Sequence, residues 1–538
     1  MSEYFLGLDC STQSLTGIII DSTSIVYKNS INFDKDLPDY KTFNGVIRSD
    51  NEKVVHSYPL MWVEALELFL KNIQNDIPID KIKAISGSGQ QHGTVYLNNK
   101  FQAILNNLNT KKKLIDQLKV CLSRNTSPIW MDSSTSKQCE EIRNKLGGME
   151  ETIKLTGSNT FERFSGPQIR KFYQENPEGY AQTSIIHLVS SFMASVLLGK
   201  NAPIDHGDGA GMNLMNIETK KWDIRALKAT APNLREKLPV LANSYDIIGK
   251  ISPYFVKLYG FNPNTLLIAW SGDNPNSLIG VGLIEKGKVA ISLGTSDTYF
   301  GYLKDLSLDL RGEGHVFGAP TGDYMSLICY KNGSLARERI KDKFNLDWRG
   351  FSEILRKTPP GNHGKILLPY FFPEIVPLVL DSKVYRFGFD EKDIEGNVRA
   401  IIEAQFLSMR LHSEWIKEIP NEIYITGGAS TNLDIVQIIA DIFQTRIRQF
   451  DITDSAALGA ALRSLKSYYD YIKKGKNWNE IVYDFLKRQL TKKIEPNIKY
   501  KELYNDMLIL YKKCEDYILR DGEDPEPLRK KFIEDYFL

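Results

Sequence analysis

The sequence of 538 residues predicts an α/β fold divided between two domains. The chain is longer than one hydrophobic core usually serves, so two domains of ordinary size are expected. Short apolar runs alternate with segments of helical periodicity, which is typical of the α/β class. A hydroxyl-rich loop between two apolar runs occurs near the N-terminus and again near the middle of the chain. These observations together predict two related α/β domains.

In the first part of the chain, strands are predicted at 4–9, 15–21 and 24–33. Apolar residues at helical spacing predict a helix over 61–73, and the run IKAISGSG predicts a buried strand over 82–89. The region 145–200 is expected to be mostly helical. Its most apolar stretch, 188–199, is too short and too rich in serine to cross a bilayer, so it predicts a buried helix.

In the second part, strand–loop–strand is predicted over 288–303, and a further strand over 324–330. Residues 421–443 predict a strand, a glycine turn and an amphipathic helix. The apolar side of that helix is expected to comprise Leu433, Val436, Ile439 and Phe443. A closing helix is predicted with Leu503, Met507, Leu510 and Tyr511 at helical spacing.

Composition limits the kind of partner. Lys plus Arg number 68 and Asp plus Glu number 66, for a net charge of +2. Nucleic-acid binding is not indicated, since it usually leaves a basic footprint. The five cysteines are odd in number and have no zinc-site spacing, which favours reduced thiols in the cytoplasm. The N-terminus runs into the first strand without a basic region, so no signal peptide is predicted.

The two hydroxyl-rich loops are candidate phosphate sites. In the first, Asp9 precedes Cys10-Ser11-Thr12-Gln13-Ser14; the second is Gly294-Thr295-Ser296-Asp297-Thr298. Small residues at such tips let backbone N–H groups approach a phosphate closely. Two unrelated hairpins with polar tips would give the same pattern, because Ser, Thr and Gly are common in turns.

Four further residues are candidates for a binding site. Asp273 and Asn274 follow the apolar run LLIAW, where they suit a cleft or, alternatively, a helix N-cap. His92 lies in GSGQQHG, where a structural histidine is the alternative. Arg163 lies among aromatic residues in FERFSG and suits stacking as well as ligand binding. The turn TGGAST at 426–431 could bring a helix N-terminus to an anion or ribose. The alternative is a tight strand-to-helix turn without a binding role.

Several nucleotide and metal motifs are missing from the sequence. It contains no G-x-x-x-x-G-K-[ST] loop, no protein-kinase signature set and no H-E-x-x-H metal site. The acidic and glycine-rich run DHGDGAG does not have the spacing of an EF-hand. P-loop and protein-kinase functions are therefore not supported.

Taken together, these stretches resemble the FGGY carbohydrate kinases of the actin-like ATPase superfamily. The similar stretches occur in the family's order from residue 4 to about 465; they are LGLDCSTQS, SGSGQQHG, SPIWMDSSTSKQC, LTGSNTFERFSGPQI, PIDHGDGAGMNLM, GDNPNSL, VAISLGTSDT, YKNGSLARERI and TGGASTN. The resemblance implies two ribonuclease H-like domains facing a central cleft, closing on their ligands. Residues 1–264 would form the sugar-binding domain and 265–538 the ATP-binding domain.

The resemblance also implies roles for individual residues. Asp273 matches the catalytic base, and Asp9 matches the carboxylate near magnesium. His92, Arg163 and Asn274 match sugar contacts together with Asp273, with His92 and Arg163 as hydrogen-bond donors. The residues matching ATP contacts are Ser11, Thr12, Gln13, Gly294, Thr295, Ser296, Trp348, Gly428, Ala429 and Asn432.

The implied activity is phosphorylation of a sugar by ATP with Mg²⁺. The WMDSS and ERFSG stretches are most similar to kinases of D-xylulose, which implies D-xylulose 5-phosphate as product. A kinase of another pentulose or polyol, and a non-catalytic sugar sensor or assembly protein on the same fold, are the alternatives. The expected partners are a small sugar and ATP, without nucleic acid or membrane, and the oligomeric state, monomer or homodimer, is left open.

Overall fold

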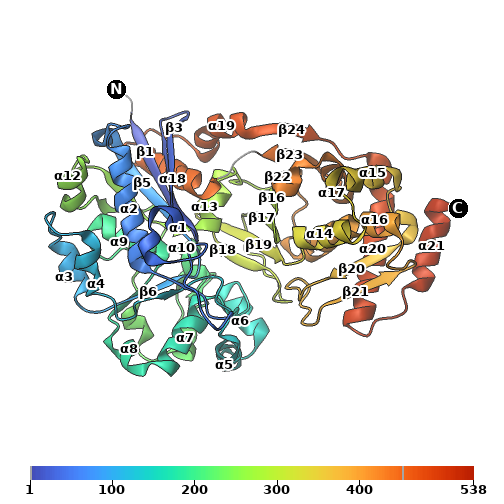
Figure 1. Ribbon diagram of the computed structural model, residues 1–538, viewed down its shortest axis with the longest axis horizontal. Helices are drawn as coiled ribbons and strands as arrows, with labels where there is room; N and C mark the ends of the chain where they lie inside the picture. Colours follow the sequence, from blue (N-terminus) through green and yellow to red (C-terminus); the bar gives the residue numbers. More distant parts are fainter. Residues whose placement is uncertain (1–2, 451–453) are drawn as a thin grey trace. The chain divides into compact units, whose positions relative to one another are not determined.

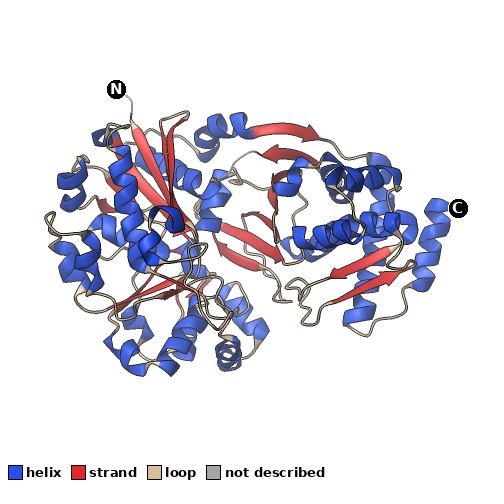
Figure 2. Cartoon of the chain, viewed as in Figure 1, coloured by secondary structure: helices blue, strands red, loops and turns tan. Residues whose placement is uncertain are grey.

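The computed structural model describes residues 3–450 and 454–538 (Figure 1). The chain forms two compact units that interleave in sequence. Unit 1 comprises Met1–Ile284, Tyr302–Met325 and Thr453–Arg488, and unit 2 comprises Glu285–Gly301, Ser326–Ile452 and Gln489–Leu538. The predicted ranges 1–264 and 265–538 differ from this division, because residues 265–284 and two later segments group with unit 1. Both units combine helices with strands, as the α/β prediction requires (Figure 2).

The main sheet of unit 1 has the order β13-β14-β5-β1-β2-β3, and β15 also pairs with β5. β1, β2 and β3 form an antiparallel meander, whereas β5 runs parallel to β1, and β14 and β15 parallel to β5. The strands are β1 (Tyr4–Cys10), β2 (Ser14–Ile20), β3 (Ile25–Asn32), β5 (Ile82–Gly89), β13 (Ile247–Lys250), β14 (Leu266–Ile268) and β15 (Ser271–Gly272). The predicted strands at 4–9, 15–21, 24–33 and 82–89 are confirmed.

Helices pack against both faces of this sheet. A Cβ on Gly7 of β1 would lie 2.1 Å from the carbonyl oxygen of Ala457 in α18 (Ser455–Tyr471), so glycine is needed for this close packing. A Cβ on Gly17 of β2 would lie 2.1 Å from the ring of Phe69 in α2 (Pro59–Ile73). The predicted helix over 61–73 is thus confirmed, and its apolar side joins the core of unit 1.

The rest of unit 1 is mainly helical, with a small antiparallel pair of strands, β6 (Thr94–Leu97) and β8 (Ile185–Leu188). The predicted buried helix is α9 (Val189–Leu198), in which every residue is buried. Among the residues described, no helix is both long enough and apolar enough to cross a membrane. The other elements are α1 (Phe33–Asp36), β4 (His56–Ser57), α3 (Phe101–Asn106), α4 (Leu114–Lys119), β7 (Ser127–Pro128), α5 (Ser136–Leu146), α6 (Met149–Thr156), α7 (Ser165–Glu175), α8 (Pro177–Gln182), β9 (Ile204–Asp205), α10 (His206–Ala210), β10 (Met215–Asn216), β11 (Lys221–Trp222), α11 (Ile224–Thr230), β12 (Leu241–Ala242), α12 (Pro253–Tyr259), α13 (Asp273–Gly280), β18 (His315–Gly318) and α19 (Trp478–Gln489).

Unit 2 repeats the same strand pattern, in the order β19-β17-β16-β22-β23-β24. β16 and β17 form an antiparallel hairpin, and β22 runs parallel to β16, as β5 does to β1. The predicted duplication of a hairpin with a polar tip is therefore confirmed. The strands are β16 (Lys288–Leu293), β17 (Asp297–Leu303), β19 (Tyr324–Tyr330), β22 (Glu422–Gly427), β23 (Arg446–Phe450) and β24 (Leu490–Ile494), with a separate pair β20 (Ile366–Tyr370) and β21 (Lys383–Phe387).

The helices of unit 2 include two that the sequence predicted. In α17 (Leu433–Phe443), Val436, Ile439 and Phe443 are buried as expected, but Leu433, the first residue of the helix, is 43% exposed. In α20 (Lys501–Leu519), all four predicted apolar residues are buried. The other helices are α14 (Ser334–Lys343), α15 (Trp348–Lys357), α16 (Ile394–His412) and α21 (Glu526–Phe537).

The closing helix α20 belongs to the core of unit 2. Tyr504 donates to Oε1 of Glu403 in α16 at 2.9 Å and accepts from Nη2 of Arg399 at 2.7 Å. These three side chains are buried, and Oε1 of Glu403, the guanidinium of Arg399 and the phenol of Tyr504 form one hydrogen-bonded group. The C-terminal segment is therefore an integral part of the unit.

Candidate active site

Two carboxylates lie at one edge of the unit 1 sheet. Asp9 at the end of β1 lies opposite Ser88 of β5, and Ser271 of β15 also lies opposite Ser88. Asp273 follows β15 directly as the first residue of α13. Because the carboxyl ends of parallel strands meet at the same edge of a sheet, Asp9 and Asp273 are brought close, and their charges interact.

One oxygen of Asp273 is held firmly and the other is left unoccupied. Oδ1 accepts from the backbone N–H of Gln91 at 3.3 Å, from the backbone N–H of Asn274 at 2.9 Å and from Nδ2 of Asn274 at 3.2 Å. No hydrogen bond to Oδ2 is made within residues 3–450 and 454–538. Burial raises the pKa of Asp273 to about 6, despite these N–H donors. A carboxylate fixed in this way can accept a proton through Oδ2 near neutral pH.

The side chain of Gln91 belongs to the same hydrogen-bonded group as Asp273 and Asn274. Nδ2 of Asn274 donates to Oε1 of Gln91 at 2.8 Å, while Nε2 of Gln91 is buried and has no partner among the described residues. The unused N–H group of this amide is a donor beside Asp273. Gln91 lies in the motif GSGQQHG, but the sequence predicts no role for it. A single glutamine in a sequence does not show which groups its amide contacts.

Asp9 is the second carboxylate of the site. Its Oδ1 accepts from the hydroxyl of Ser88, across the β1–β5 pairing. Burial raises its pKa to about 7, with a smaller contribution in the same direction from the charges of Asp273 and Asp454. Asp454 itself forms an ion pair with Lys28. Asp9 thus lies in a negative field where binding of a cation would be favourable.

His92 is buried and adopts a left-handed backbone conformation with φ of 72°. Its Nδ1 is 2.9 Å from the carbonyl oxygen of Gly211, and its ring stacks on Phe164 with centroids 4.4 Å apart. Burial and the charge of Arg163 lower its pKa to about 3, so the ring is neutral. A carbonyl can only accept, so Nδ1 carries the proton and Nε2 is an acceptor. The resemblance suggested a donor at His92, whereas the geometry makes its free nitrogen an acceptor.

Arg163 is held by aromatic rings and by a histidine that the sequence analysis did not select. Its guanidinium lies 5.1 Å from the ring centroid of Phe161 and 5.8 Å from that of Phe164. Nη2 of Arg163 is 2.9 Å from Nε2 of His315 in β18. The predicted residues His92, Arg163, Asp273 and Asn274 are thus linked by direct contacts through Gln91 and Phe164. We call this group the Asp273 site.

The first polar loop forms a tight hairpin tip between β1 and β2. The backbone N–H of Ser11 donates to the carbonyl oxygen of Ser14 at 3.0 Å, and Gln13 is exposed. Oγ1 of Thr12 accepts from Nε1 of Trp130 at 2.8 Å and donates to Oε1 of Gln90 at 3.4 Å. The loop is therefore tied to the segments WMDSS and GQQHG of the same unit.

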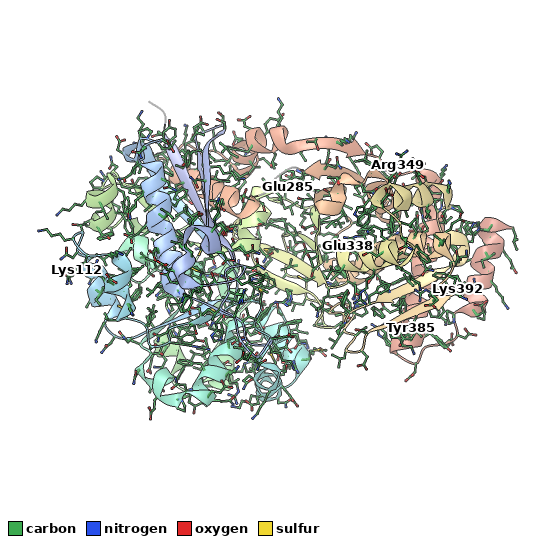
Figure 3. The ribbon with its side chains drawn as sticks, viewed as in Figure 1. Lys112, Glu285, Glu338, Arg349, Tyr385 and Lys392 are labelled. Carbon is green, nitrogen blue, oxygen red and sulfur yellow. The ribbon has the colours of Figure 1, made fainter. Side chains whose placement is uncertain are left out.

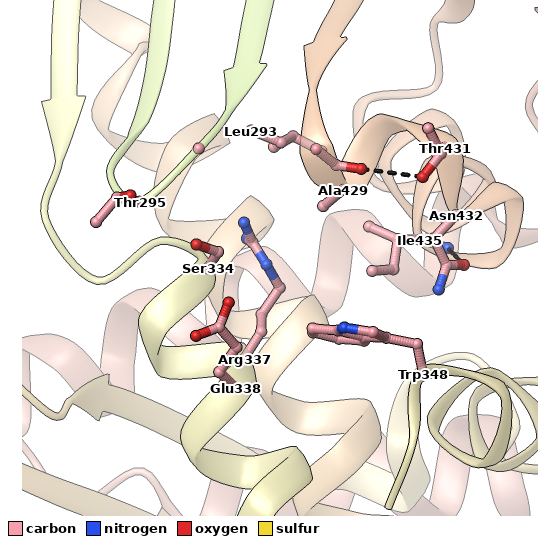
Figure 4. A pocket seen from close by; sticks show the side chains of 12 residues that line it. Leu293, Thr295, Ser334, Arg337, Glu338, Trp348, Ala429, Thr431, Asn432 and Ile435 are labelled. Carbon is pink, nitrogen blue, oxygen red and sulfur yellow. Dashed lines mark hydrogen bonds between the residues drawn. The ribbon is translucent and has the colours of Figure 1, made fainter. Parts of the chain in front are cut away.

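Unit 2 contains a pocket of about 520 Å³ at the ends of β16 and β22 (Figure 4). Six predicted ATP-site residues line it, and Ser296, also predicted, is not part of its lining. The lining residues are Leu293, Gly294, Thr295, Ser334, Arg337, Glu338, Trp348, Gly428, Ala429, Thr431, Asn432 and Ile435. We call it the Trp348 pocket.

Trp348 begins α15 and contributes an indole that is 41% exposed while facing this pocket (Figure 4). Its ring packs edge-on against Phe351, with centroids 5.5 Å apart. An indole that is partly exposed and lines the pocket suits stacking on a planar ring. Figure 3 marks the neighbouring Arg349 on α15 and Glu338 on α14.

The glycine turn after β22 forms the opposite wall of the pocket. Gly427 has φ of 91°, and a Cβ there would lie 2.3 Å from the carbonyl oxygen of Leu293, so glycine is required. A Cβ on Gly428 would meet nothing within 4 Å, which leaves room for a ligand. Asn432 caps α17, accepting from the N–H groups of Asp434 and Ile435, and donates to Ser352. Asn432 therefore has a structural role in addition to lining the pocket.

A buried ion pair anchors the second polar loop. Arg337 of α14 binds Asp297 in two contacts, Nη1 to Oδ2 at 2.7 Å and Nη2 to Oδ1 at 3.0 Å. Nη1 also donates to Oε1 of Gln405 at 2.9 Å. Because Asp297 ends the loop Gly294-Thr295-Ser296, this pair fixes the loop on α14. Arg337 lies within the quoted motif YKNGSLARERI, whose helical spacing places Ser334, Arg337 and Glu338 on one side of α14.

The residues at the sheet edge of unit 1 suit a magnesium ion in part. No group of three or more His, Cys, Asp or Glu side chains able to hold a metal is found among the described residues. Magnesium commonly uses one or two carboxylates and keeps waters and substrate phosphates as its other ligands. Asp9, a carboxylate at the end of β1, has the chemistry for one such ligand.

Comparison with known proteins agrees with this arrangement. The profile "FGGY family of carbohydrate kinases, N-terminal domain" matches residues 4–280, and the corresponding C-terminal domain matches residues 289–468. "Xylulose kinase 2" of Arabidopsis thaliana is 46% identical over 484 residues, which are 86% of this chain and 86% of the relative. "Xylulose kinase" of Rattus norvegicus is 39% identical over 533 residues, 97% of this chain and 98% of the relative.

The fold is also that of solved kinases. The ligand-bound xylulose kinase of Lactobacillus acidophilus superposes with a TM-score of 0.79 at 20% identity, covering 96% of this chain and 99% of that one. At this identity the likeness concerns the fold alone. The two-part α/β fold, the repeated strand order and both domain profiles lead to one conclusion: this chain belongs to the FGGY family of carbohydrate kinases.

Proposed function

We propose that the protein transfers the γ-phosphoryl group of ATP to the terminal hydroxyl of D-xylulose, which gives D-xylulose 5-phosphate. The relatives named as xylulose kinases support this choice of sugar. Asp273 acts as general base, accepting the proton of the hydroxyl as it attacks phosphorus.

The geometry of Asp273 is the observation that carries the proposal. Three N–H groups fix Oδ1, so Oδ2 has a defined position for the substrate hydroxyl. A pKa of about 6 keeps the carboxylate ionised at neutral pH while leaving it basic enough to take a proton. Neither property is needed by a residue that serves only to begin α13.

The polar groups around Asp273 match a ketose. The neutral His92 ring offers an acceptor for a sugar hydroxyl, and Arg163 offers N–H donors for an oxygen that can only accept, such as a carbonyl. Asn274 and Gln91 add amide groups to the same edge. A sugar that fails to pair these buried groups loses affinity, so discrimination among sugars is expected.

ATP is proposed to bind through the Trp348 pocket and the two polar loops. Trp348 packs on the adenine, and the backbone around Gly428 and Ala429 approaches the nucleoside. Ser11, Thr12 and Gln13 on one hairpin, and Gly294, Thr295 and Ser296 on the other, bind phosphate oxygens. Asp9 would hold Mg²⁺, which when bound neutralises phosphate charge.

A coupled assay of ADP release tests the proposal. The purified protein is given ATP and Mg²⁺ with D-xylulose, L-ribulose, xylitol, glycerol or gluconate, and Asp273→Asn serves as the inactive control. We expect kcat/KM for D-xylulose to exceed the others by far. Equal turnover of glycerol would refute the sugar assignment, and no ADP release with any sugar would favour a sensor.

The working environment is a second part of the proposal. We propose a reducing cytoplasmic location, which the odd number of cysteines and their lack of zinc-site spacing support. Fractionation of cells that express the full chain with a tag tests it, and recovery in a secreted or organellar fraction would contradict it.

A further inference from the structure

Arg163 has an unusual set of neighbours for a cation in a binding site. No carboxylate lies within ion-pair distance of it in the part of the chain that is described. Its contacts are the rings of Phe161 and Phe164 and the imidazole of His315. Its positive charge is therefore left for a ligand, whereas an acidic partner would have neutralised it.

The protonation state of His315 follows from this contact. A guanidinium has only donors, so Nε2 of His315, 2.9 Å from Nη2 of Arg163, must accept. The ring is 1% exposed, and its neutral form is favoured by burial and by the charge of Arg163. The proton is then on Nδ1, which is buried and has no partner among the described residues.

That unpartnered N–H indicates why a histidine stands here. A buried polar group without a hydrogen bond destabilises a protein, and an apolar side chain would avoid the cost. The hydrogen bond from Arg163 to Nε2 is an interaction that an apolar side chain could not provide at this position. The imidazole is therefore explained by what it does for Arg163.

Aromatic packing makes His315 rigid. Its ring stacks on Phe317, with centroids 5.7 Å apart and planes at 16°, and meets the edge of Phe161 at 4.7 Å. Phe164 contacts both His315, at 5.4 Å, and His92, at 4.4 Å. A continuous set of contacts thus joins His315 to the Asp273 site.

We propose that His315 is a positioning residue for the substrate. It holds the guanidinium of Arg163 as a charged N–H donor for the carbonyl oxygen of a ketose, and so contributes to the preference for a ketose over the corresponding polyol. This inference rests on the proposed function. A carbonyl oxygen only accepts hydrogen bonds, whereas the hydroxyl of a polyol also carries a proton, so a fixed cationic donor favours the ketose.

His315→Leu and His315→Gln test the proposal. Leucine removes the acceptor, while the amide oxygen of glutamine can replace Nε2. We expect His315→Leu to raise the KM for D-xylulose by about 10- to 100-fold with a smaller change in kcat, since displacement of a binding group costs up to about that much. The Kd of xylitol, measured by calorimetry, should change by less than about threefold. Xylitol has a hydroxyl in place of the carbonyl, so it depends less on the hydrogen bond from Arg163. His315→Gln should recover most of the KM.

His187→Leu is the matched control. His187 is also fully buried in unit 1, and its ring nitrogens lie 3.0 Å from Ser191 and 3.1 Å from Asn201. This variant should lose stability while keeping the ratio of D-xylulose to xylitol affinity. Two results would overturn the proposal. One is an equal loss of affinity for D-xylulose and for xylitol in His315→Leu, and the other is no loss of affinity for D-xylulose when His315→Leu has a wild-type circular dichroism spectrum. If His315→Leu fails to fold, the ratio of D-xylulose to xylitol affinity is measured in Arg163→Lys and in His315→Gln. A wild-type ratio in Arg163→Lys then overturns the proposal.

The proposed function is tested separately by the wild-type protein. Failure of the wild type to phosphorylate D-xylulose overturns that function whatever the variants do. A ketose that the wild type does phosphorylate is then compared with its own polyol. An unchanged ratio for that pair in His315→Leu refutes the positioning role alone.

Discussion

Replacement of Asp273 by asparagine separates chemistry from folding. The amide oxygen of Asn can still accept the N–H groups of Gln91 and Asn274 that bind Oδ1, so the turn is retained. The variant lacks a base at Oδ2. General-base catalysis typically contributes roughly 100- to 10,000-fold, so kcat should fall by that factor. This corresponds to about 2.7–5.4 kcal/mol of activation free energy.

The effect of the same substitution on stability has the opposite sign. The pKa of Asp273 is raised to about 6 in the folded protein from a usual 3.8. Its stabilising contribution is fully present below the unfolded pKa and is lost as pH rises through 6, since folding disfavours the ionised form. Asp273→Asn should therefore melt at the same or a higher temperature than the wild type at pH 7.5. The gain in the free energy of unfolding should be up to about 3 kcal/mol. At pH 4 the gain should vanish.

The measurements are kcat, the KM of each substrate and the melting temperature on one preparation. Asp223→Ala is the control, since Asp223 caps α11 by accepting from Arg225 and Ala226. It should lose about 1 kcal/mol of stability and keep its turnover. If Asp273→Asn instead melts early and turns over at nearly the wild-type rate, Asp273 only begins a helix and the base lies elsewhere.

Three further predictions concern other parts of the site. Trp348→Ala should raise the KM for ATP and leave the sugar KM nearly unchanged in steady-state kinetics, because stacking on the base is lost; an unchanged ATP KM would assign the indole to packing. A plot of kcat/KM against pH should fall below about pH 6, as Asp273 (pKa about 6) takes up a proton; a flat profile down to pH 5 would contradict this. Arg337→Met should cost about 3–5 kcal/mol in urea unfolding, because Asp297 is left buried and unpaired; a loss below 1 kcal/mol would show that the pair is not important for stability.

The local elements were predictable from the sequence because apolar periodicity is local. The strands β1, β2, β5 and β16 and the helices α2 and α17 lie within a few residues of their predicted bounds, and α20 contains the four apolar residues predicted for the closing helix. Asp273 was recognisable as a site candidate for the same reason, since a carboxylate directly after a buried strand reaches a sheet edge. Five of the six predicted residues of the Trp348 pocket lie in short turns after strands, whereas Trp348 begins α15.

Other features depend on contacts between distant residues and could not be predicted. The acceptor role of His92 follows from the carbonyl of Gly211, which is 119 positions away. His315 meets Arg163 across 152 positions, and no local pattern marks it. The exposure of Leu433 depends on what covers the start of α17, which periodicity does not reveal. The interleaved units likewise depend on which later segments return to unit 1.

The packing of α18 on β1 has a consequence for synthesis of the protein. A nascent chain that has completed β1 and β5 leaves one face of that sheet bare until α18, Ser455–Tyr471, leaves the ribosome. At roughly 5–20 residues per second this takes on the order of 20–70 s. During that time α18 does not cover the face of β1 that carries Gly7, and this face is open to other chains. A message truncated before codon 455 yields a product that lacks α18 and therefore leaves this face of the sheet without that cover.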